Sequence, residues 1–294
     1  MPELPDVAVY VEALHRKVVG HRLEGVKLSS PFVLRSYDPP LDAIAGRAVR
    51  GVRRIGKRIV LDMGDELFVV IHLMIAGRLR WRARGQKAGV GAKIILATFQ
   101  FDDGYLVFSE AGSKKRASIT LVRGEDALKA LDPGGVEPLT TTKEEFAAAL
   151  RRENHTLKRA LTDPHLFSGI GNAYSDEILH AARLSPMKLT KSMDDAEIER
   201  LWKATRETLA SWTDILRGEA GDFPENVTAF RPGMAVHGRY GKPCPVCEAP
   251  VQRIVYAENE ANYCARCQTE GRLLADRSLS RLLKDDWPKS IDDL

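Results

Sequence analysis

All four cysteines of the chain lie near its C-terminal end, in one regular pattern. They form two Cys-x2-Cys pairs separated by sixteen residues: Cys244, Cys247, Cys264 and Cys267. Two such pairs at this separation can close a tetrahedral site of four thiolates around one Zn²⁺. Four protein ligands leave no open coordination position, so we expect the metal to hold a hairpin together rather than to take part in chemistry.

Two disulfides or a redox dithiol are the alternatives for these cysteines. The N-terminus lacks the basic and apolar regions of a signal peptide, and no apolar stretch approaches the roughly 20 residues of a membrane helix. We therefore expect a cytoplasmic protein with no membrane partner. Disulfides are rare in cytoplasmic proteins, and the chain has no cysteine outside this pattern. Both facts disfavour the two alternatives.

The first part of the chain begins with a helical pattern and continues with strand patterns. Apolar residues recur at helical spacing over residues 6–17. Runs of strand-forming residues then alternate with short turns, which predicts strands at 58–63, 67–73, 95–101, 105–108 and 118–122. The pattern is typical of an antiparallel β-sandwich or barrel behind a leading helix.

Helical patterns follow the turn residues Asp-Pro-Gly-Gly at 132–135. Thr142 and Glu145 have the spacing of a capping box at a helix start, and a long amphipathic helix is predicted over 194–217. A length of 294 residues allows two domains and a small third module. The sequence thus predicts a multidomain α+β protein with a β-sandwich at 1–131, a linker at 132–141, a helical domain at 142–235, a zinc hairpin at 236–277 and a tail at 278–294.

Positive charge is concentrated between residues 47 and 87. This stretch has eleven lysines and arginines against three acids, whereas the net charge of the whole chain is only +4. Within it, arginines alternate with other residues at Arg78, Arg80, Arg82 and Arg84. On a strand, this period of two places all four on one face. Such a face can bind a polyanion or can simply be solvated, and the pattern alone leaves both interpretations open.

Two short motifs are each ambiguous alone. The prolines and acids of residues 2–6, Pro-Glu-Leu-Pro-Asp, suit a helix start. The glycines of residues 169–172, Gly-Ile-Gly-Asn, can make a tight turn before a helix. They can equally bring backbone N–H groups close to a phosphate.

The order of these motifs resembles that of the formamidopyrimidine-DNA glycosylase and endonuclease VIII family. The resemblance extends to about Gln268 and includes Lys57, residues 72–77, residues 169–177 and the Val-His-Gly-Arg at 236–239. It implies an N-terminal β-sandwich, a helix–two-turn–helix domain and a zinc hairpin with one structural Zn²⁺. It also implies a monomer of the bacterial cytoplasm and nucleoid, whose partner is double-stranded DNA containing a damaged base or an abasic site.

The activity that the resemblance implies is base-excision repair by a DNA glycosylase. Such an enzyme removes oxidised or ring-opened bases and cleaves the abasic site as a lyase, by β/δ-elimination. Once Met1 is removed, the amine of Pro2 would attack the sugar and form a Schiff base. Glu3 matches the family's proton-transfer carboxylate, Lys57 matches an assisting lysine, and Asp6 stands where the family usually has glutamate.

Two other functions stay open at this point. One is a lyase-only or non-catalytic paralogue that binds damaged DNA. A ribosomal or transcription zinc-ribbon protein is a more distant alternative, since it would not need a proline–glutamate N-terminus.

The resemblance also implies contacts to the DNA backbone. Asn172 and the helix start behind it would bind a phosphate. Lys158 and Arg239 match positions that contact phosphate or support the hairpin, and Glu177 matches one that supports the glycine motif from within. His72 is more often a satisfied core histidine than a catalyst, so we assign it no chemistry.

Two departures from the family concern the gap that a flipped base leaves. The family's wedge methionine aligns with Ile75, and Met74 aligns with a glycine, so either side chain could intercalate. The loop that reads the opposite base lacks its aromatic residue, although Lys114, Lys115 and Arg116 keep it basic. We expect such a loop to be loosely held and to discriminate little between opposite bases; a solvated run of charge is the alternative.

Two further departures lie at the C-terminal end. Asn259 replaces the hairpin arginine that clamps the lesion phosphate in the family, and Arg253 could substitute for it. Beyond Cys267 the chain continues for twenty-seven residues. Their apolar pattern predicts a short helix packed onto the body of the protein through Leu279, Leu282, Leu283 and Trp287.

Overall fold

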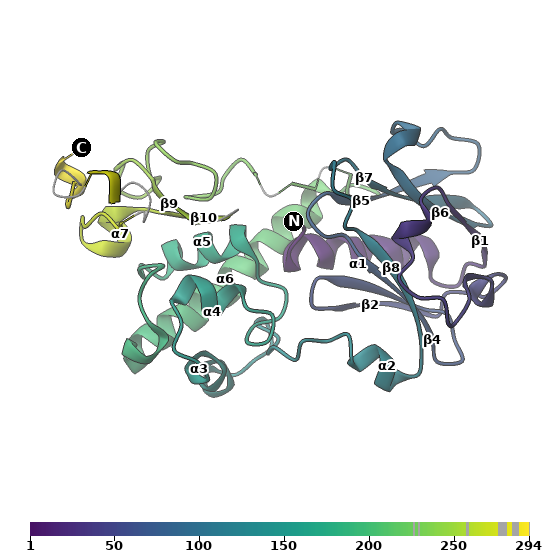
Figure 1. Cartoon of the computed structure of the whole chain (residues 1–294), viewed down its shortest axis with the longest axis horizontal. Helices are drawn as coiled ribbons and strands as arrows, with labels where there is room; N and C mark the ends of the chain where they lie inside the picture. Colours follow the sequence, from purple (N-terminus) through teal and green to yellow (C-terminus); the bar gives the residue numbers. More distant parts are fainter. Residues whose placement is uncertain (226, 229, 257–258, 276–280, 284–287, 294) are drawn as a thin grey trace. The chain divides into compact units, whose positions relative to one another are not determined.

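The computed structural model describes residues 1–294 except 226, 229, 257–258, 276–280, 284–287 and 294 (Figure 1). The chain folds into two compact units. The first comprises Met1–Pro133 and Trp212–Thr228, and the second comprises Gly134–Ser211 and Ala229–Leu294. The break after residue 133 lies in the stretch 132–141 that the sequence predicts as a linker.

The first unit has a leading helix, α1 (Leu4–Val18), and two four-stranded antiparallel sheets (Figure 1). The strand order is β1-β6-β7-β5 in one sheet and β2-β3-β4-β8 in the other. The strands are β1 (Leu23–Leu28), β2 (Gly51–Ile55), β3 (Arg58–Asp62), β4 (Leu67–His72), β5 (Gly77–Ala83), β6 (Ile95–Phe101), β7 (Gly104–Glu110) and β8 (Ser118–Arg123). Short helices lie between and after them: η1 (Pro31–Val33), η2 (Leu41–Ile44), η3 (Ala92–Ile94) and α2 (Glu125–Lys129). The predicted antiparallel sandwich behind a helix is confirmed.

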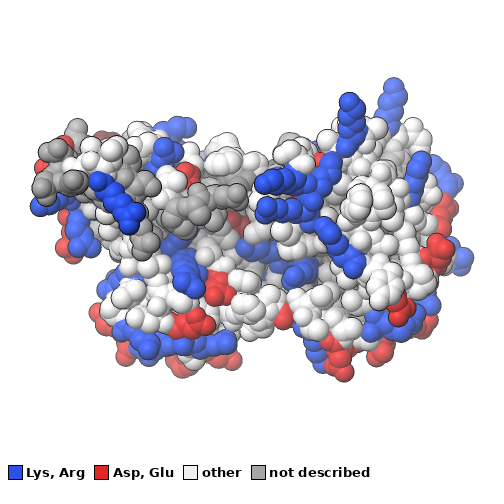
Figure 2. Space-filling view, in the orientation of Figure 1, with Lys and Arg blue, Asp and Glu red and all other residues white. Residues whose placement is uncertain are grey.

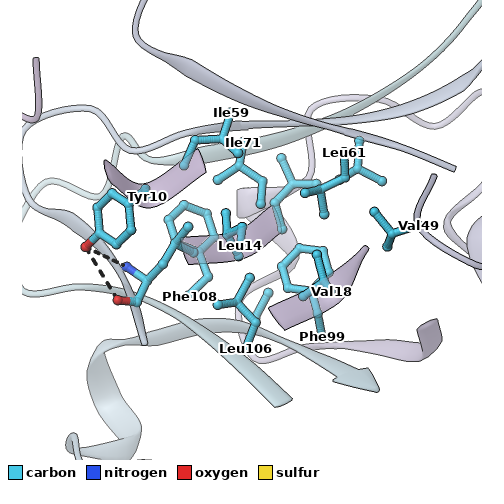
Figure 3. Packing of buried hydrophobic residues seen from close by; sticks show 14 of the residues in the cluster. Tyr10, Leu14, Val18, Val49, Ile59, Leu61, Ile71, Phe99, Leu106 and Phe108 are labelled. Carbon is cyan, nitrogen blue, oxygen red and sulfur yellow. Dashed lines mark hydrogen bonds between the residues drawn. The ribbon is translucent and has the colours of Figure 1, made fainter. Parts of the chain in front are cut away.

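The core of this unit is built from α1 and both sheets. Figure 3 shows Leu14 of α1 with Ile59 and Ile71 of one sheet on one side and Phe99 and Phe108 of the other sheet on the other. All five side chains are fully buried. Burial of a side chain of this size stabilises the fold by about 1.5–3 kcal/mol. The helix is therefore part of the sandwich core, and the residues just before it are fixed in place with it.

The segment Trp212–Thr228 also belongs to this core. Phe223 and Val227 are buried in the same cluster, and the Phe223 ring lies 5.9 Å from the ring of Tyr10. The sequence places these residues in a helical domain over 142–235, whereas the structure groups them with the first unit. Apolar side chains far along the chain complete the sandwich, which no local pattern indicates.

The second unit is mainly helical and contains a two-stranded hairpin. Thr142 caps α3, since its hydroxyl accepts a hydrogen bond from Glu145 N at 3.2 Å and Thr142 N donates to the Glu145 carboxylate at 2.9 Å. The predicted capping box is therefore confirmed. The elements are α3 (Lys143–Arg151), α4 (Leu157–Thr162), α5 (Asn172–Ala181), η4 (Thr190–Ser192), α6 (Asp195–Glu219, of which residues 212–219 count with the first unit), β9 (Gln252–Tyr256), β10 (Asn259–Tyr263), α7 (Ala265–Thr269) and η6 (Ile291–Asp293). None of the helices in the described part of the chain is long and apolar enough to cross a membrane.

The C-terminal tail returns to the zinc hairpin, but by other residues than the sequence predicts. Ile291 is 6% exposed and belongs to the hairpin's apolar cluster, and its N–H donates to Gly271 O at 2.7 Å. Leu282 and Leu283 are 76% and 39% exposed, so the prediction that they pack onto the body is wrong. Leu279 and Trp287 lie outside the described residues.

Candidate functional site

Residues 2–6 are buried at the start of α1. Glu3 and Asp6 are 2% and 4% exposed, and Pro2 is buried as well. The backbone N–H of Glu3 donates a hydrogen bond to Asp6 Oδ2 at 2.8 Å. Asp6 thus satisfies a backbone donor at the helix start, where several N–H groups have no partner within the helix. Asp6 thus takes the N3 position that Glu or Gln ordinarily has in a capping box.

Four charged side chains act on the N-terminal amine. Burial lowers the pKa of the Met1 amino group below its ordinary value; Glu3 and Asp6 oppose this shift, whereas Arg78 and Lys57 add to it. Burial also lowers the pKa of Lys57, with Glu3 acting in the opposite direction. A lowered pKa increases the neutral fraction of an amine at neutral pH, which makes it a better nucleophile or proton acceptor. The structure therefore brings Glu3, Asp6 and Lys57 together at the N-terminus, as the sequence predicts.

Arg78 belongs to this cluster, although the sequence does not single it out as a site residue. Its Nε donates to Val227 O at 2.7 Å, and its Nη1 donates to Gly77 O at 2.7 Å and to Ile75 O at 3.2 Å. These carbonyl groups hold the guanidinium in one orientation. The signal in the sequence is its place as the first of the four alternating arginines.

Of the other three arginines, Arg80 and Arg82 lie on the same face of β5 as Arg78, as predicted, since burial alternates along the strand, whereas Arg84 lies in the turn after the strand ends at Ala83. Each has a partner within the first unit: Ser109 Oγ at 2.9 Å for Arg80, Glu225 for Arg82, and Glu24 at 3.1 Å for Arg84. This pairing favours an internal role over a free polyanion-binding face. On the face of the first unit in Figure 2, Lys and Arg side chains gather around β5 and β7.

The turn between β4 and β5 presents one apolar side chain to solvent. Ile75 is 59% exposed, whereas Met74 is partly buried and has a left-handed φ of 51°. Gly77 N donates to Leu73 O at 2.8 Å, and a Cβ at Gly77 would lie only 2.2 Å from that oxygen. Close backbone approach thus requires glycine at 77. Of the two wedge candidates, Ile75 is the side chain that is available to a partner.

The basic loop 111–117 joins β7 to β8. Lys115 and Arg116 are exposed, in keeping with their predicted contact to DNA. However, Glu110 is 2% exposed and accepts hydrogen bonds from Arg116 N at 2.9 Å and Ala117 N at 3.1 Å. The end of the loop is therefore held more firmly than the sequence predicts, because a buried carboxylate anchors the backbone of residues 116 and 117 where the family has an aromatic residue; the expected weak discrimination between opposite bases stays a prediction.

In the second unit, α5 begins at Asn172, directly after the glycine motif. Gly169 has a φ of 79°, a conformation that favours glycine. Asn172 is partly exposed at the helix N-terminus, where the positive end of the helix dipole favours an anion. This position suits the expected phosphate contact, which stays a prediction.

Lys158 does not offer its charge to solvent. Its side chain is 3% exposed, and its Nζ donates to Asn172 O at 2.6 Å, to Ser175 Oγ at 2.8 Å and to Asp176 Oδ1 at 2.5 Å. These three bonds use all the donors of an ammonium group. The prediction of a phosphate contact by Lys158 is therefore corrected, because the side chain supports the start of α5 from inside.

Two neighbouring carboxylates connect α5 with the segment that leads into the zinc hairpin. Glu177 accepts hydrogen bonds from three backbone N–H groups, those of Ala235, Val236 and His237, at 2.6–2.9 Å. Burial raises the pKa of Glu177, and these hydrogen bonds oppose the shift. Asp176 Oδ2 contacts His237 Nδ1 at 2.8 Å and accepts from Asn262 at 3.3 Å. Glu177 thus acts from inside the unit, as predicted, but its hydrogen bonds support the segment 235–237 and not the glycine motif.

The four cysteines lie together and are free thiols. Their Sγ atoms are within 4.8 Å of one another, with separations of 3.3 Å for Cys247–Cys264 and 3.9 Å for Cys244–Cys267. A disulfide has an S–S distance of about 2.05 Å, so the alternative of two disulfides is excluded. Four sulfurs about 2.3 Å from a central ion fit these separations. The site is therefore that of one structural Zn²⁺.

Arg239 and Arg253 lie near this hairpin. Arg239 Nη2 donates to Pro243 O at 2.9 Å, which favours the hairpin-supporting role over a phosphate contact. Arg253 stacks over the Tyr240 ring at 4.4 Å, and the strand register pairs it with Asn262 rather than with Asn259. Substitution of Arg253 for the absent arginine at 259 stays a prediction.

Models of known protein families match all three parts of the chain: the sandwich, the helices and the zinc hairpin. The model of the formamidopyrimidine-DNA glycosylase N-terminal domain matches residues 1–111, and that of the formamidopyrimidine-DNA glycosylase H2TH domain matches residues 135–217. A model described as a zinc finger found in FPG and IleRS matches residues 241–269. These matches agree with the order of sandwich, helices and zinc hairpin.

Individual relatives show the same likeness. The formamidopyrimidine-DNA glycosylases of Desulforamulus reducens and Heliobacterium modesticaldum are both 32% identical to this chain. Each alignment covers 91% of this chain, with 99% and 100% of the relative. The fold is similar to that of Lactococcus lactis Fpg in a complex with abasic-site DNA, at a TM-score of 0.79 and 24% identity over 91% of this chain and 99% of the other. The chain therefore belongs to the formamidopyrimidine-DNA glycosylase family and is a DNA glycosylase.

Proposed function

We propose that the protein removes oxidised or ring-opened bases from double-stranded DNA and then cleaves the abasic site, with the amine of Pro2 as nucleophile. The observation that carries the proposal is the burial of Pro2 beside the carboxylates Glu3 and Asp6. The amino group of Met1, one residue before it, has a pKa that burial lowers and on which Arg78 and Lys57 also act. Solved complexes of Lactococcus lactis Fpg with abasic-site DNA and with oxidised-pyrimidine DNA support this substrate class.

The first stage releases the damaged base. Removal of Met1 makes Pro2 a free secondary amine, and the target base leaves the stack at a cost of a few kcal/mol. The amine attacks C1′, the bond from C1′ to the base breaks, and the base departs with the proton of the amine. Glu3 donates a proton to the ring oxygen as the sugar opens, which leaves an iminium between Pro2 and C1′.

The second stage cuts the strand. The iminium withdraws electrons from C2′, so a C2′ proton can leave and the 3′ phosphate is eliminated. A second elimination removes the 5′ phosphate, and water then hydrolyses the Schiff base and restores Pro2. Lys57 and Asn172 hold phosphates during these steps, and Ile75 fills the gap that the flipped base leaves.

The proposal is tested by borohydride trapping on an oligonucleotide with one abasic site. We expect a covalent adduct with protein whose N-terminus is Pro2, and a loss of at least about tenfold when a removable tag precedes that residue. Proteolytic removal of the tag, with Pro2 exposed again, is the matched control and should restore the adduct. If tagged and untagged protein trap equally well, the nucleophile is a lysine and not Pro2.

A lyase-only paralogue is the second candidate, and Asn259 favours it because the family's phosphate-clamping arginine is absent there. Single-lesion duplexes resolved on a denaturing gel separate the two functions. A glycosylase cleaves 8-oxoguanine, formamidopyrimidine or oxidised-pyrimidine duplexes as well as abasic ones. A lyase-only protein cleaves the abasic duplex and none of the others.

A further inference from the structure

Glu110 is a buried carboxylate that the proposed mechanism does not use. It ends β7, is 2% exposed, and its Oε2 accepts both the Arg116 N–H at 2.9 Å and the Ala117 N–H at 3.1 Å. Burial of a carboxylate is costly unless hydrogen bonds compensate for the lost water. Here the compensating donors all come from the backbone of the basic loop 111–117, so this buried group fixes the end of that loop.

Lys115 fixes the middle of the same loop. Its Nζ donates to Glu110 O at 3.0 Å and to Lys93 O at 3.2 Å, so it joins the loop to the segment before β6. The loop has no other anchor of this kind in the described part of the chain. There, the side chains of Lys114 and Arg116 are exposed and have no hydrogen bond or ion pair. The loop is thus held at its base while two of its cations stay available.

The loop 111–117 lies beside the turn between β4 and β5, which carries Ile75. Gly77, where β5 begins, is the register partner of Glu110, so the turn 73–77 and the loop 111–117 leave the sheet at the same end. A Cβ at Gly112 would lie 3.6 Å from the Cβ of Ala76. The loop therefore packs beside the turn that carries Ile75, the side chain proposed to enter the gap of the flipped base.

We propose that Glu110 is a positioning residue which, with Lys115, holds Lys114 and Arg116 against the base opposite the lesion. This inference rests on the proposed function. Ordering a mobile loop costs free energy each time it binds, and a pre-ordered loop avoids that cost. A cation on an ordered loop reaches a limited region, so it distinguishes base edges by the placement of their acceptors better than a cation on a mobile loop does. The protein therefore discriminates between opposite bases, in contrast to the small discrimination that the sequence predicts.

Equilibrium binding tests the inference without catalysis. The probes are four duplexes in which a tetrahydrofuran abasic analogue faces C, A, G or T. For the wild type we expect the tightest and weakest Kd to differ by about tenfold or more, within the roughly 5- to 150-fold range of one directed base contact. The readout is the ratio of the weakest to the tightest Kd among the four duplexes, called the spread, within each variant. A loss of affinity that is common to all four duplexes does not change this ratio.

The variants distinguish an effect of the position of the loop from an effect of its positive charge. Glu110→Ala removes the acceptor, and Lys115→Met removes the second anchor; each should reduce the spread to about twofold. Glu110→Gln should retain the spread, because an amide oxygen can accept the same two N–H bonds. Lys93→Met is the matched control for Lys115→Met, since it removes an equal charge but keeps the Lys93 carbonyl, and it should also retain the spread.

Three results would overturn the proposal: a wild-type spread below about twofold, an unchanged spread in Lys115→Met, or an equal loss in Lys93→Met. Lys115 is on the surface, so this variant carries the test even where Glu110→Ala fails to fold. Borohydride trapping of the wild type on a single-stranded abasic oligonucleotide, which has no opposite base, reports the proposed function separately.

Discussion

Replacing Lys158 by methionine should destabilise the second unit by about 3–5 kcal/mol. The side chain is 3% exposed, and its ammonium group has three acceptors, among them Asp176. Removing one partner of a buried ion pair leaves the other charge without compensation, which costs about 3–5 kcal/mol. Asp176 keeps its contacts to His237 and Asn262. We therefore expect a value in the lower half of that range.

The assay is urea and thermal denaturation of the zinc-loaded protein. At roughly 2–4 °C per kcal/mol for a unit of about 150 residues, the transition of the second unit should fall by roughly 6–16 °C. A double-mutant cycle with Asp176→Asn isolates the pair. The double variant should be less destabilised than the sum of the two single variants, because no unpaired charge is left in the interior.

Lys203→Met is the matched control. Lys203 pairs with Glu199 at 2.7 Å on the exposed face of α6, with a side chain 55% exposed. Its loss should cost less than about 0.5 kcal/mol. The reasoning is refuted if Lys158→Met melts like the wild type and instead flattens the dependence of log Kd on log salt by about 0.9, since that slope is the signature of a lost phosphate contact.

Three further predictions concern the metal, pH and salt. Cys264→Ser should lower zinc content from about one per chain to near zero and abolish DNA binding, while the first unit keeps its thermal transition; full binding by metal-free protein would contradict this. Burial lowers the pKa of His72 to about 4, so the folded state resists protonation. Stability should then fall by about 3 kcal/mol as pH drops from about 6.5 to about 4, and urea titrations of His72→Gln should lack this part of the fall. Arg82→Gln should leave the salt dependence of binding to undamaged duplex unchanged because Glu225 already pairs with that arginine; a flatter slope would return Arg82 to the phosphate contacts.

Features with a local signature could be predicted from the sequence. The spacing of Thr142 and Glu145 is a local signal for a capped helix, and the structure has the capping box. The alternation from Arg78 to Arg84 predicts one face of a strand, and β5 has this face as far as Arg82. The two Cys-x2-Cys pairs predict a thiolate site, and the four sulfurs lie together.

Features that depend on distant partners could not be predicted in this way. Arg82 finds its partner 143 residues along the chain, so the strand pattern cannot show whether its charge is free. Lys158 occupies a position that matches a DNA-contacting family residue, and only three-dimensional packing shows its ammonium group inside the unit. Glu110 has no recognisable motif, because the bonds that define its role go to backbone N–H groups, which every residue but proline carries.

The inclusion of Trp212–Thr228 in the first unit has a consequence for synthesis on the ribosome. A nascent chain that ends at residue 133 has both sheets but lacks Phe223 and Val227, which are buried in the core. The missing segment is complete only at Thr228, 95 residues later, which corresponds to roughly 5–20 s at about 5–20 residues per second. During that interval the sandwich exposes an apolar surface, and the second unit's first helices emerge before the sandwich is complete. A truncation after residue 133 would make this transient exposure permanent, so a soluble first unit requires the returning segment to be supplied, in cis through a short linker or as a peptide in trans.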